Sequence, residues 1–307
     1  MIDMTTWPNE IFSPENPVVT QDLQSFLGGL ENDSTLFHPK QLRKRLDALD
    51  DLDIRFEDFS AARYINDPDA RIANHARAMR ARLEAVNTAL YESMRSEIVR
   101  GAPPHLLLQW IQAPASREQT ASGLGYDYRD EVVTGVLQLR EPSESRLHPL
   151  PEMVFYQPTP VRHILRLITA SAFSQGDVFV DLGSGLGHVA LLASMLTGVR
   201  SFGIEVDPAY VASAQECAQS LHLSQVRFIR EDARAADLSS GTVFYLYSPF
   251  TGSILADVLA RLEQESKSRP IKIGALGPCA CILAKESWLK PIAPPDPKQI
   301  TVFQRRL

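Results

Sequence analysis

Cysteine is scarce in this chain of 307 residues, and long apolar runs and an excess of positive charge are lacking too. Three cysteines, Cys217, Cys279 and Cys281, are too few for a disulfide framework. Cys279 and Cys281 lie one residue apart with no histidine or second cysteine pair nearby, so we predict small core residues rather than metal ligands. No apolar run approaches the roughly 20 residues that span a bilayer, which argues against a membrane protein.

The first residues, MIDMTTWPNE, lack the basic and then apolar layout of a secretion signal, so the default expectation is a cytoplasmic protein. The formal net charge is −6. Residues 1–125 carry 13 Lys and Arg against 18 Asp and Glu, and residues 126–307 carry 18 against 19. Neither part has the basic footprint of a nucleic-acid binder, so DNA and RNA are unfavoured partners.

The pattern of residues 1–125 predicts a helical domain. A short helix capped by Thr20 should end near Gly28-Gly29, and a second should begin near Pro39. A third begins at Asn66 or Asp67 and carries an apolar stripe of Ile72, Met79, Leu83, Val86, Leu90, Met94 and Ile98. At 1.5 Å per residue this helix would be about 50 Å long, so the stripe should pack on several neighbours or on a second copy of the chain. We therefore predict a substrate lid or a homodimer interface in this domain.

A polar, glycine-bearing segment at 116–125 reads as a linker to a second domain, residues 126–307. Tyr126 and Tyr128 follow, among three charged residues, and an extended segment is predicted over 131–140. The two tyrosines could line a substrate entrance or simply pack beside surface charges, and Tyr128 is one candidate for orienting a substrate.

The most informative stretch runs from Asp177 to Pro208. An apolar run at 178–180 predicts a strand buried on both faces of a parallel sheet. Gly183, Gly185 and Gly187 follow at once, so the backbone can turn sharply and approach a ligand without a Cβ in the way. A helix begins after this turn, which places the glycines at its positive end. A second strand then ends near Glu205.

The charges of this stretch indicate what it binds. A dinucleotide site would need a third glycine at position 188, which is histidine here. Asp181 precedes the glycines, and a carboxylate there repels a diphosphate but suits a cationic ligand. Glu205 could accept hydrogen bonds from two ribose hydroxyls. A helix start that binds no ligand remains the alternative.

This order of an acid, three alternating glycines and a terminal acid resembles the class I S-adenosylmethionine-dependent methyltransferases. The resemblance implies an α/β fold with a Rossmann-like seven-stranded sheet and S-adenosyl-L-methionine as cofactor. It assigns the amino-acid tail of the cofactor to Asp181 and to the loop that contains Ser184, and the ribose to Glu205. The adenine edge would fall to Asp232 and Ala233, with Asp237 as the alternative acid.

A narrower resemblance comes from Tyr-x-x-x-Thr before a helix, followed by VDLGSGLGHVAL and FGIEVDPAYVASA. These segments are similar to the catalytic domain of the histone H3 lysine-79 methyltransferases over residues 156–214. By that resemblance Tyr156 and Thr159 would close over the methionine moiety of the cofactor.

The loop Tyr247-Ser248-Pro249-Phe250 after the fourth predicted strand departs from these families. Related amine-methylating enzymes carry Asn or Asp where this chain has Tyr247. A hydroxyl of Tyr247 or Ser248 would therefore have to orient the acceptor, with His188 a less favoured candidate. This disfavours adenine and glutamine amides and leaves lysine open. Packing of the Tyr247 ring beside the cofactor, without a chemical role, is the alternative.

Taken together, these patterns predict a transferase that moves a methyl group to an unidentified acceptor, with a protein lysine as one candidate. A small-molecule methyltransferase and a non-catalytic scaffold with the same fold stay open. The last strands are predicted at 271–276, 281–284 and 300–303, with an antiparallel edge strand at 300–304.

Overall fold

The structure is a computed structural model that describes residues 17–61, 67–112, 125–142 and 152–306. The chain divides into two compact units, Met1–Glu92 and Ser93–Leu307. This division falls inside helix α3 (Asp67–Val99), whereas the sequence suggested one at residue 125, which stays a prediction of the functional boundary. Residue 66 and, apart from Gly125, the predicted linker at 116–125 lie outside the described residues.

The first unit is a helical bundle, as predicted. It contains α1 (Pro17–Asn32), two short 3-10 helices, η1 (Ser34–Phe37) and η2 (Pro39–Gln41), then α2 (Leu42–Ala61) and the first part of α3. The predicted cap at Thr20 is wrong, since α1 already begins at Pro17; the helix passes through Gly28-Gly29 and ends at Asn32, soon after these two glycines. Leu27 and Leu30 on either side of them are buried in the bundle core, and this burial outweighs the cost of about 1 kcal/mol per helical glycine.

The second unit begins with the end of α3, α4 (His105–Ile111) and α5 (Tyr128–Leu137). The extended segment predicted at 131–140 is therefore wrong over most of its length. Asp127 and Asp130 form a reciprocal capping box that starts α5. The buried residues Val132, Val133, Val136 and Leu137 then recur at helical spacing, so the apolar run is one face of a helix.

A seven-stranded sheet forms the centre of the second unit, in the order β3-β2-β1-β4-β5-β7-β6. Its strands are β1 (Val178–Leu182), β2 (Arg200–Glu205), β3 (Val226–Arg230), β4 (Val243–Leu246), β5 (Lys272–Ala275), β6 (Leu289–Pro291) and β7 (Thr301–Arg305). The first five strands of this order are parallel, and β7 runs antiparallel to β5 and to β6. The predicted Rossmann-like seven-stranded sheet is confirmed.

Two details near the carboxyl end differ from the prediction. Residues 281–284 were expected to form a strand but lie largely in α10 (Pro278–Leu283). Gly277 at φ +82° and Pro278 in the first turn start this helix, and its apolar sequence does not distinguish strand from helix. The antiparallel strand β7 is not the edge of the sheet, because β6 pairs on its outer side.

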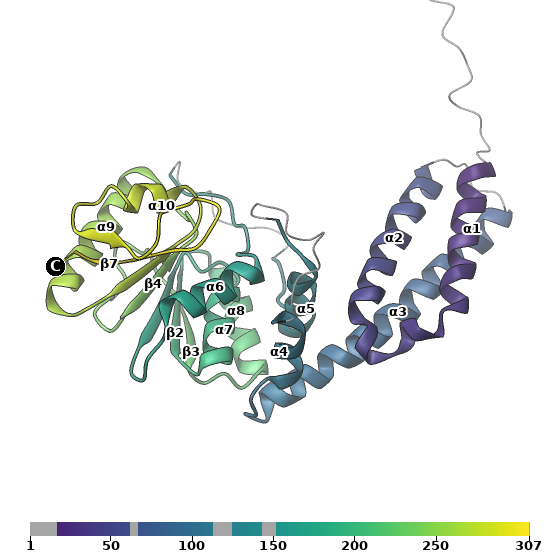
Figure 1. The fold of residues 1–307 in the computed structure, drawn as a ribbon, viewed down its shortest axis with the longest axis horizontal. Helices are drawn as coiled ribbons and strands as arrows, with labels where there is room; N and C mark the ends of the chain where they lie inside the picture. The colour runs from purple at the N-terminus through teal and green to yellow at the C-terminus, as the bar shows by residue number, and fades with distance from the viewer. Residues whose placement is uncertain (1–16, 62–66, 113–124, 143–151, 307) are drawn as a thin grey trace, which may run out of the picture. The chain divides into compact units, whose positions relative to one another are not determined.

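Helices cover both faces of this sheet (Figure 1). On one face α9 (Gly252–Ser268) and α10 share a buried core with alternate strand residues such as Val180 and Leu246. On the other lie α6 (Val161–Ser171), α7 (His188–Thr197) and α8 (Pro208–Ser220). None of the described helices is both long and apolar enough to cross a membrane.

Candidate active site

A cavity of about 550 Å³ opens at the carboxyl ends of β1, β2 and β4. Ligands of open α/β sheets bind at this edge, where the strand order reverses. Residues from five stretches of the second unit line the cavity: 153–159, 181–189, 204–210, 231–233 and 245–254, joined by Pro278, Cys279 and Ile282 of α10. The size is typical of a site for a small organic ligand.

The glycine turn has the tight geometry that the sequence predicts. Gly185 has φ +51°, and a Cβ built on it would lie 2.0 Å from the ring of Tyr156. Gly187 has φ +84°, and its Cβ would lie 2.4 Å from the ring of Phe228. Both the backbone conformation and the available space therefore require glycine. Gly183 lines the cavity, whereas Gly185 and Gly187 do not.

The glycine turn is fastened to β2 by hydrogen bonds. The N–H groups of Gly183 and Ser184 donate to the carbonyl oxygen of Ile204, at 2.9 and 3.0 Å. The N–H of Gly185 donates to Oε2 of Glu205 at 2.9 Å, while Oε1 accepts from the N–H groups of Val206 and Asp207. Glu205 thus braces the turn and also lines the cavity, as expected of a ribose-binding acid.

Asp181 is the buried carboxyl group of this cavity. Within the described part of the chain, its Oδ2 has no hydrogen-bond partner. Burial, and to a lesser extent the negative charge of Glu205, raises the pKa of Asp181 to about 8. A cation placed beside this oxygen would supply the missing partner and stabilise the ionised form. The arrangement fits the predicted role of Asp181 toward a positively charged amino group.

The predicted adenine residues lie together at the end of β3. Asp232 forms an ion pair with Arg234 at 2.7 Å, and this contact lowers the pKa of Asp232. Ala233 is buried, and its carbonyl oxygen accepts from Nη1 of Arg261 at 3.0 Å. Both line the cavity. The alternative acid, Asp237, does not line it and accepts instead from the N–H of Ser239 at 2.9 Å.

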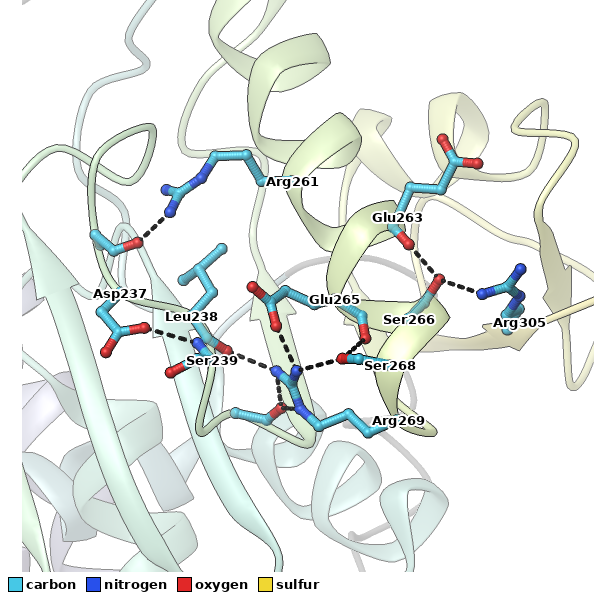
Figure 2. A network of polar contacts seen from close by, with 12 residues as sticks. Asp237, Leu238, Ser239, Arg261, Glu263, Glu265, Ser266, Ser268, Arg269 and Arg305 are labelled. Carbon is cyan, nitrogen blue, oxygen red and sulfur yellow. Dashed lines mark hydrogen bonds and ion pairs between the residues drawn. The ribbon is translucent and has the colours of Figure 1, made fainter.

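Arg261 of α9 and Arg269, the residue that directly follows this helix, hold the segment that leads from Ala233 to β4. Figure 2 shows Arg261 and Arg269 turned toward this segment. Nη2 of Arg261 donates to the carbonyl oxygen of Ala236 at 2.6 Å. Nη2 of Arg269 donates to Leu238 and Gly241, at 2.7 and 2.8 Å. One end of the segment is thereby bonded to α9 and the other to the residue that caps this helix.

Tyr156 and Thr159 lie at the cavity as the narrower resemblance predicts. The hydroxyl of Tyr156 lies 3.0 Å from Nδ1 of His188, and its ring packs against Tyr210 at 5.1 Å between centroids. Burial lowers the pKa of His188 to about 4, so this imidazole is neutral at physiological pH. The hydroxyl of Thr159 lies 3.0 Å from that of Tyr245 in β4.

Tyr247 and Ser248 behave differently from each other, although both line the cavity. The Tyr247 hydroxyl is buried and has no partner among the described residues. Ser248, at φ +45°, donates to the carbonyl oxygen of Leu276 at 3.2 Å and accepts from the N–H of Cys279 at 3.0 Å. Of the two hydroxyls, that of Tyr247 is therefore the one without a hydrogen-bond partner among the described residues.

The third predicted acceptor residue lies elsewhere. Tyr128 is buried in α5, its hydroxyl donates to the carbonyl oxygen of Trp110 at 3.0 Å, and it is not among the residues that line the cavity. The first tyrosine of the same cluster is closer: Tyr126 is 49% exposed and donates to the carbonyl oxygen of Pro158, which lines the cavity. The position of Tyr128 therefore gives no support to its predicted role.

Sequence reasoning missed two parts of the cavity wall. Tyr245 was treated as an ordinary residue of the fourth strand, although a tyrosine within a strand that is buried throughout must find a partner for its hydroxyl. Pro278, Cys279 and Ile282 belong to α10, and the sequence pattern predicts no helix at these positions.

The sheet, the glycine turn and the two acids together define the class of a Rossmann-like, class I methyltransferase fold. Residues 153–232 match the family model described as "Histone methylation protein DOT1". This match confirms the local resemblance found in the sequence, and it covers the Tyr-x-x-x-Thr segment, the glycine turn and Asp232.

Several of the solved structures to which this chain is similar are methyltransferases by name. An RNA methyltransferase from Salinibacter ruber, in complex with S-adenosyl-L-homocysteine, is 27% identical, with a TM-score of 0.40 over 48% of this chain and 92% of its own. A SAM-dependent methyltransferase from Thiobacillus denitrificans, in complex with the same compound, is 23% identical, with a TM-score of 0.31 over 37% of this chain and 47% of its own. A precorrin-6y C5,15-methyltransferase from Geobacter metallireducens is 15% identical, with a TM-score of 0.37 over 50% of this chain and 93% of its own. No curated protein matches the chain.

Proposed function

We propose that this protein transfers a methyl group from S-adenosyl-L-methionine to an amine, with a protein lysine as the acceptor. S-Adenosylmethionine is the cofactor of the cavity. The observation that carries the assignment is Asp181, a buried carboxyl group with an unpartnered oxygen beside a glycine turn. It suits the ammonium of the cofactor, and it would repel the phosphates of a nucleotide cofactor.

Different residues of the cavity would bind different parts of the cofactor. Asp181 would bind the ammonium and Glu205 the ribose, while Asp232 and the backbone of Ala233 would meet the adenine. Because a sulfonium is already a good leaving group, the protein mainly has to align the acceptor nitrogen, the methyl carbon and the sulfur. Anchors at the ends of β1, β2 and β3 support that alignment, since these strands pair with one another in one sheet.

The acceptor end of the cavity supports an amine that arrives desolvated. Pro249, Phe250 and Ile254 provide an apolar wall there, and the Tyr247 hydroxyl beside them has no hydrogen-bond partner among the described residues. A lysine needs such a channel, because water would favour its protonated and unreactive form. The family match to a histone methylation protein is a second support for a protein acceptor.

Cofactor binding is tested by calorimetric titration of the full chain with S-adenosylmethionine and with S-adenosylhomocysteine. We expect micromolar affinity for the wild type, loss of binding in Gly185→Arg, and a large loss in Asp181→Asn. Gly185→Arg fills the space of the Tyr156 ring, whereas Asp181→Asn keeps the shape and removes the charge. Absence of binding to folded wild-type protein would refute the enzyme assignment and leave a scaffold.

The acceptor is tested by transfer of a labelled methyl group to a cell extract that is then separated by molecular mass. Label on protein, recovered as methyl-lysine after hydrolysis, is the expected result. Label in the small-molecule fraction would instead identify a metabolite methyltransferase. Binding of the cofactor with no transfer to any fraction would favour a non-catalytic scaffold.

A further inference from the structure

The amino-acid tail of S-adenosylmethionine carries a carboxylate as well as an ammonium, and Asp181 can serve only the ammonium. The described lining of the cavity contains five acids, Asp181, Glu205, Asp207, Glu231 and Asp232, and neither lysine nor arginine. His188 lines it too but is neutral, since its pKa is lowered to about 4. A carboxylate bound here must therefore be met by uncharged donors.

The glycine turn supplies few of these donors. The N–H groups of Gly183, Ser184 and Gly185 are already engaged by Ile204 and Glu205 of β2. The Ser184 hydroxyl is buried and lies 2.6 Å from the place that a Cβ on Gly203 of β2 would take. It therefore faces β2, on the side of β1 away from β4.

Tyr245 places a hydroxyl on the opposite side, next to Asp181. The two residues are direct partners in the parallel pairing of β1 and β4, so they point to the same face of the sheet. On β5 the partner of Tyr245 is Gly274, where a Cβ would lie 3.5 Å from the Tyr245 ring and 2.4 Å from Leu167 of α6. The absent side chain leaves room for the ring under α6, and the hydroxyl reaches Thr159 just before that helix.

The pairing of these two hydroxyls leaves a proton for a ligand. Each hydroxyl has one hydrogen, and the 3.0 Å contact between Thr159 and Tyr245 uses only one of the two. Burial raises the pKa of Tyr245 well above its ordinary value, so the phenol stays protonated at physiological pH. One donor of the pair is thus available at the cavity, which both residues line.

We propose that the hydroxyl pair of Tyr245 and Thr159 binds the α-carboxylate of S-adenosylmethionine, beside the ammonium held by Asp181. Tyr245 is then a cofactor-binding residue that recognises the carboxylate, the one negatively charged group of the cofactor, in an acidic cavity. The inference depends on the proposed function, because it takes the cofactor as given.

The test compares S-adenosylmethionine with decarboxylated S-adenosylmethionine, which keeps the sulfonium and the amine and lacks only the carboxylate. Tyr245→Phe keeps the ring and removes the hydroxyl. We expect calorimetry to show an affinity loss of about 10- to 100-fold for S-adenosylmethionine, as for a hydrogen bond to a charged group. For the decarboxylated ligand the affinity loss should stay within about twofold. Removal of the Tyr245 hydroxyl and removal of the ligand's carboxylate would then have coupled effects on binding.

Two further variants make the test specific. Thr159→Val should give the same pattern, and its effect should not add to that of Tyr245→Phe, because the two hydroxyls act as one unit. Tyr128→Phe deletes a buried tyrosine hydroxyl outside the cavity and should alter neither affinity. An equal loss for both ligands, or no loss for either, would overturn the proposal. Wild-type protein that binds neither ligand would instead refute the proposed function.

Discussion

At the scale of single residues, Asp181 couples cofactor binding to pH. With a pKa of about 8, it is mostly protonated at pH 7 in the empty cavity, and a bound ammonium requires the ionised form. The unfolded chain loses this proton near the ordinary aspartate pKa of 3.8, so the free energy of unfolding of the empty protein falls as the pH rises from about 4 to about 8.

Cofactor affinity should therefore rise with pH up to about 8, by at most about tenfold per unit. Calorimetry in two buffers of different ionisation enthalpy should reveal a proton released on binding at pH 7. His188 does not contribute in this range, because its pKa is about 4. Asp181→Asn should bind weakly with no such proton release, and equal heats in both buffers for the wild type would contradict the prediction.

Tyr247 is the residue that we expect to affect methyl transfer without affecting the cofactor. Tyr247→Phe removes a buried hydroxyl that has no partner in the described chain, so an acceptor would lose its orienting group. We expect kcat to fall about 10- to 100-fold, with the affinity for S-adenosylmethionine unchanged. The assay uses the acceptor that labelled transfer identifies, and an unchanged kcat would reduce Tyr247 to a packing residue.

Ser248→Ala is the contrasting variant. It deletes the hydroxyl that bridges Leu276 and Cys279, so its main expected effect is a loss of about 1–3 kcal/mol in the free energy of unfolding. Chemical denaturation of the two variants side by side separates a structural hydroxyl from a functional one. A stable Ser248→Ala protein with reduced kcat would reverse the two roles.

At the scale of secondary-structure elements, the start of α7 depends on a glycine for two reasons. Gly187→Ala would place a methyl 2.4 Å from the Phe228 ring and force alanine into a left-handed conformation. We expect a destabilisation of about 2–5 kcal/mol by denaturation. Gly198→Ala, at φ +75° with no atom within 4 Å of the new Cβ, should cost only about 1–2 kcal/mol. Equal losses of stability in the two variants would show that the contact with the Phe228 ring does not contribute to the cost of Gly187→Ala.

Arg261 in α9 and Arg269 at its carboxyl end provide another comparison between elements. Arg261→Met removes the donors to Ala233 and Ala236, next to the adenine residues, and keeps much of the aliphatic stem. We expect its S-adenosylmethionine affinity to fall about 5- to 20-fold. Arg269→Met releases Leu238 and Gly241 at the far end of the same segment, so it should lower stability by about 1–3 kcal/mol and leave the affinity unchanged. Calorimetry that shows equal affinities for the two variants would contradict this division.

Much of the fold could be predicted because local patterns agreed with it. The apolar strands before the glycine turn and before Tyr247 are each buried on both faces, and β1 and β4 carry that information in their own residues. The segments at 131–140 and 281–284 were misread as extended, since a short apolar run does not reveal its period. Their helices are fixed by a capping box at Asp127 and by Gly277-Pro278.

The position of a site residue could be predicted where it follows from a sequence motif and from parallel strand pairing. It could not be predicted where it depends on contacts across several strands. Asp181 and Glu205 end neighbouring strands, so their meeting follows from parallel pairing. The contact of Tyr245 with Thr159 joins residues 86 positions apart and depends on the absent side chain of Gly274 on a third strand. No sequence motif indicates a contact of this kind between distant residues. The roles of Tyr156, Ser184 and Ala233 toward the cofactor stay predictions until binding is measured.

At the scale of the whole molecule, the helical unit has a core of its own. The part of the α3 stripe made by Ile72, Met79 and Leu83 is buried with Leu23 and Leu52 of α1 and α2. Helices α1 and α2 are therefore the neighbours on which this part of the apolar stripe packs. A lid function and a homodimer through these helices stay predictions, and sedimentation velocity of the full chain tests the second. Ile54 of α2, 58% exposed, is the side chain to change to Glu if a dimer is found.

The surplus of acids around the cavity has a consequence for turnover. S-Adenosylmethionine carries one positive charge overall, whereas S-adenosylhomocysteine, which remains after transfer, is neutral overall. A lining with five carboxylates and neither lysine nor arginine among the described residues should bind the first about three- to tenfold more tightly, and added salt should narrow the difference. Calorimetry of both compounds at two salt concentrations checks this. The loss of one charge in the reaction would then itself help to expel the spent cofactor, so that product inhibition stays weak.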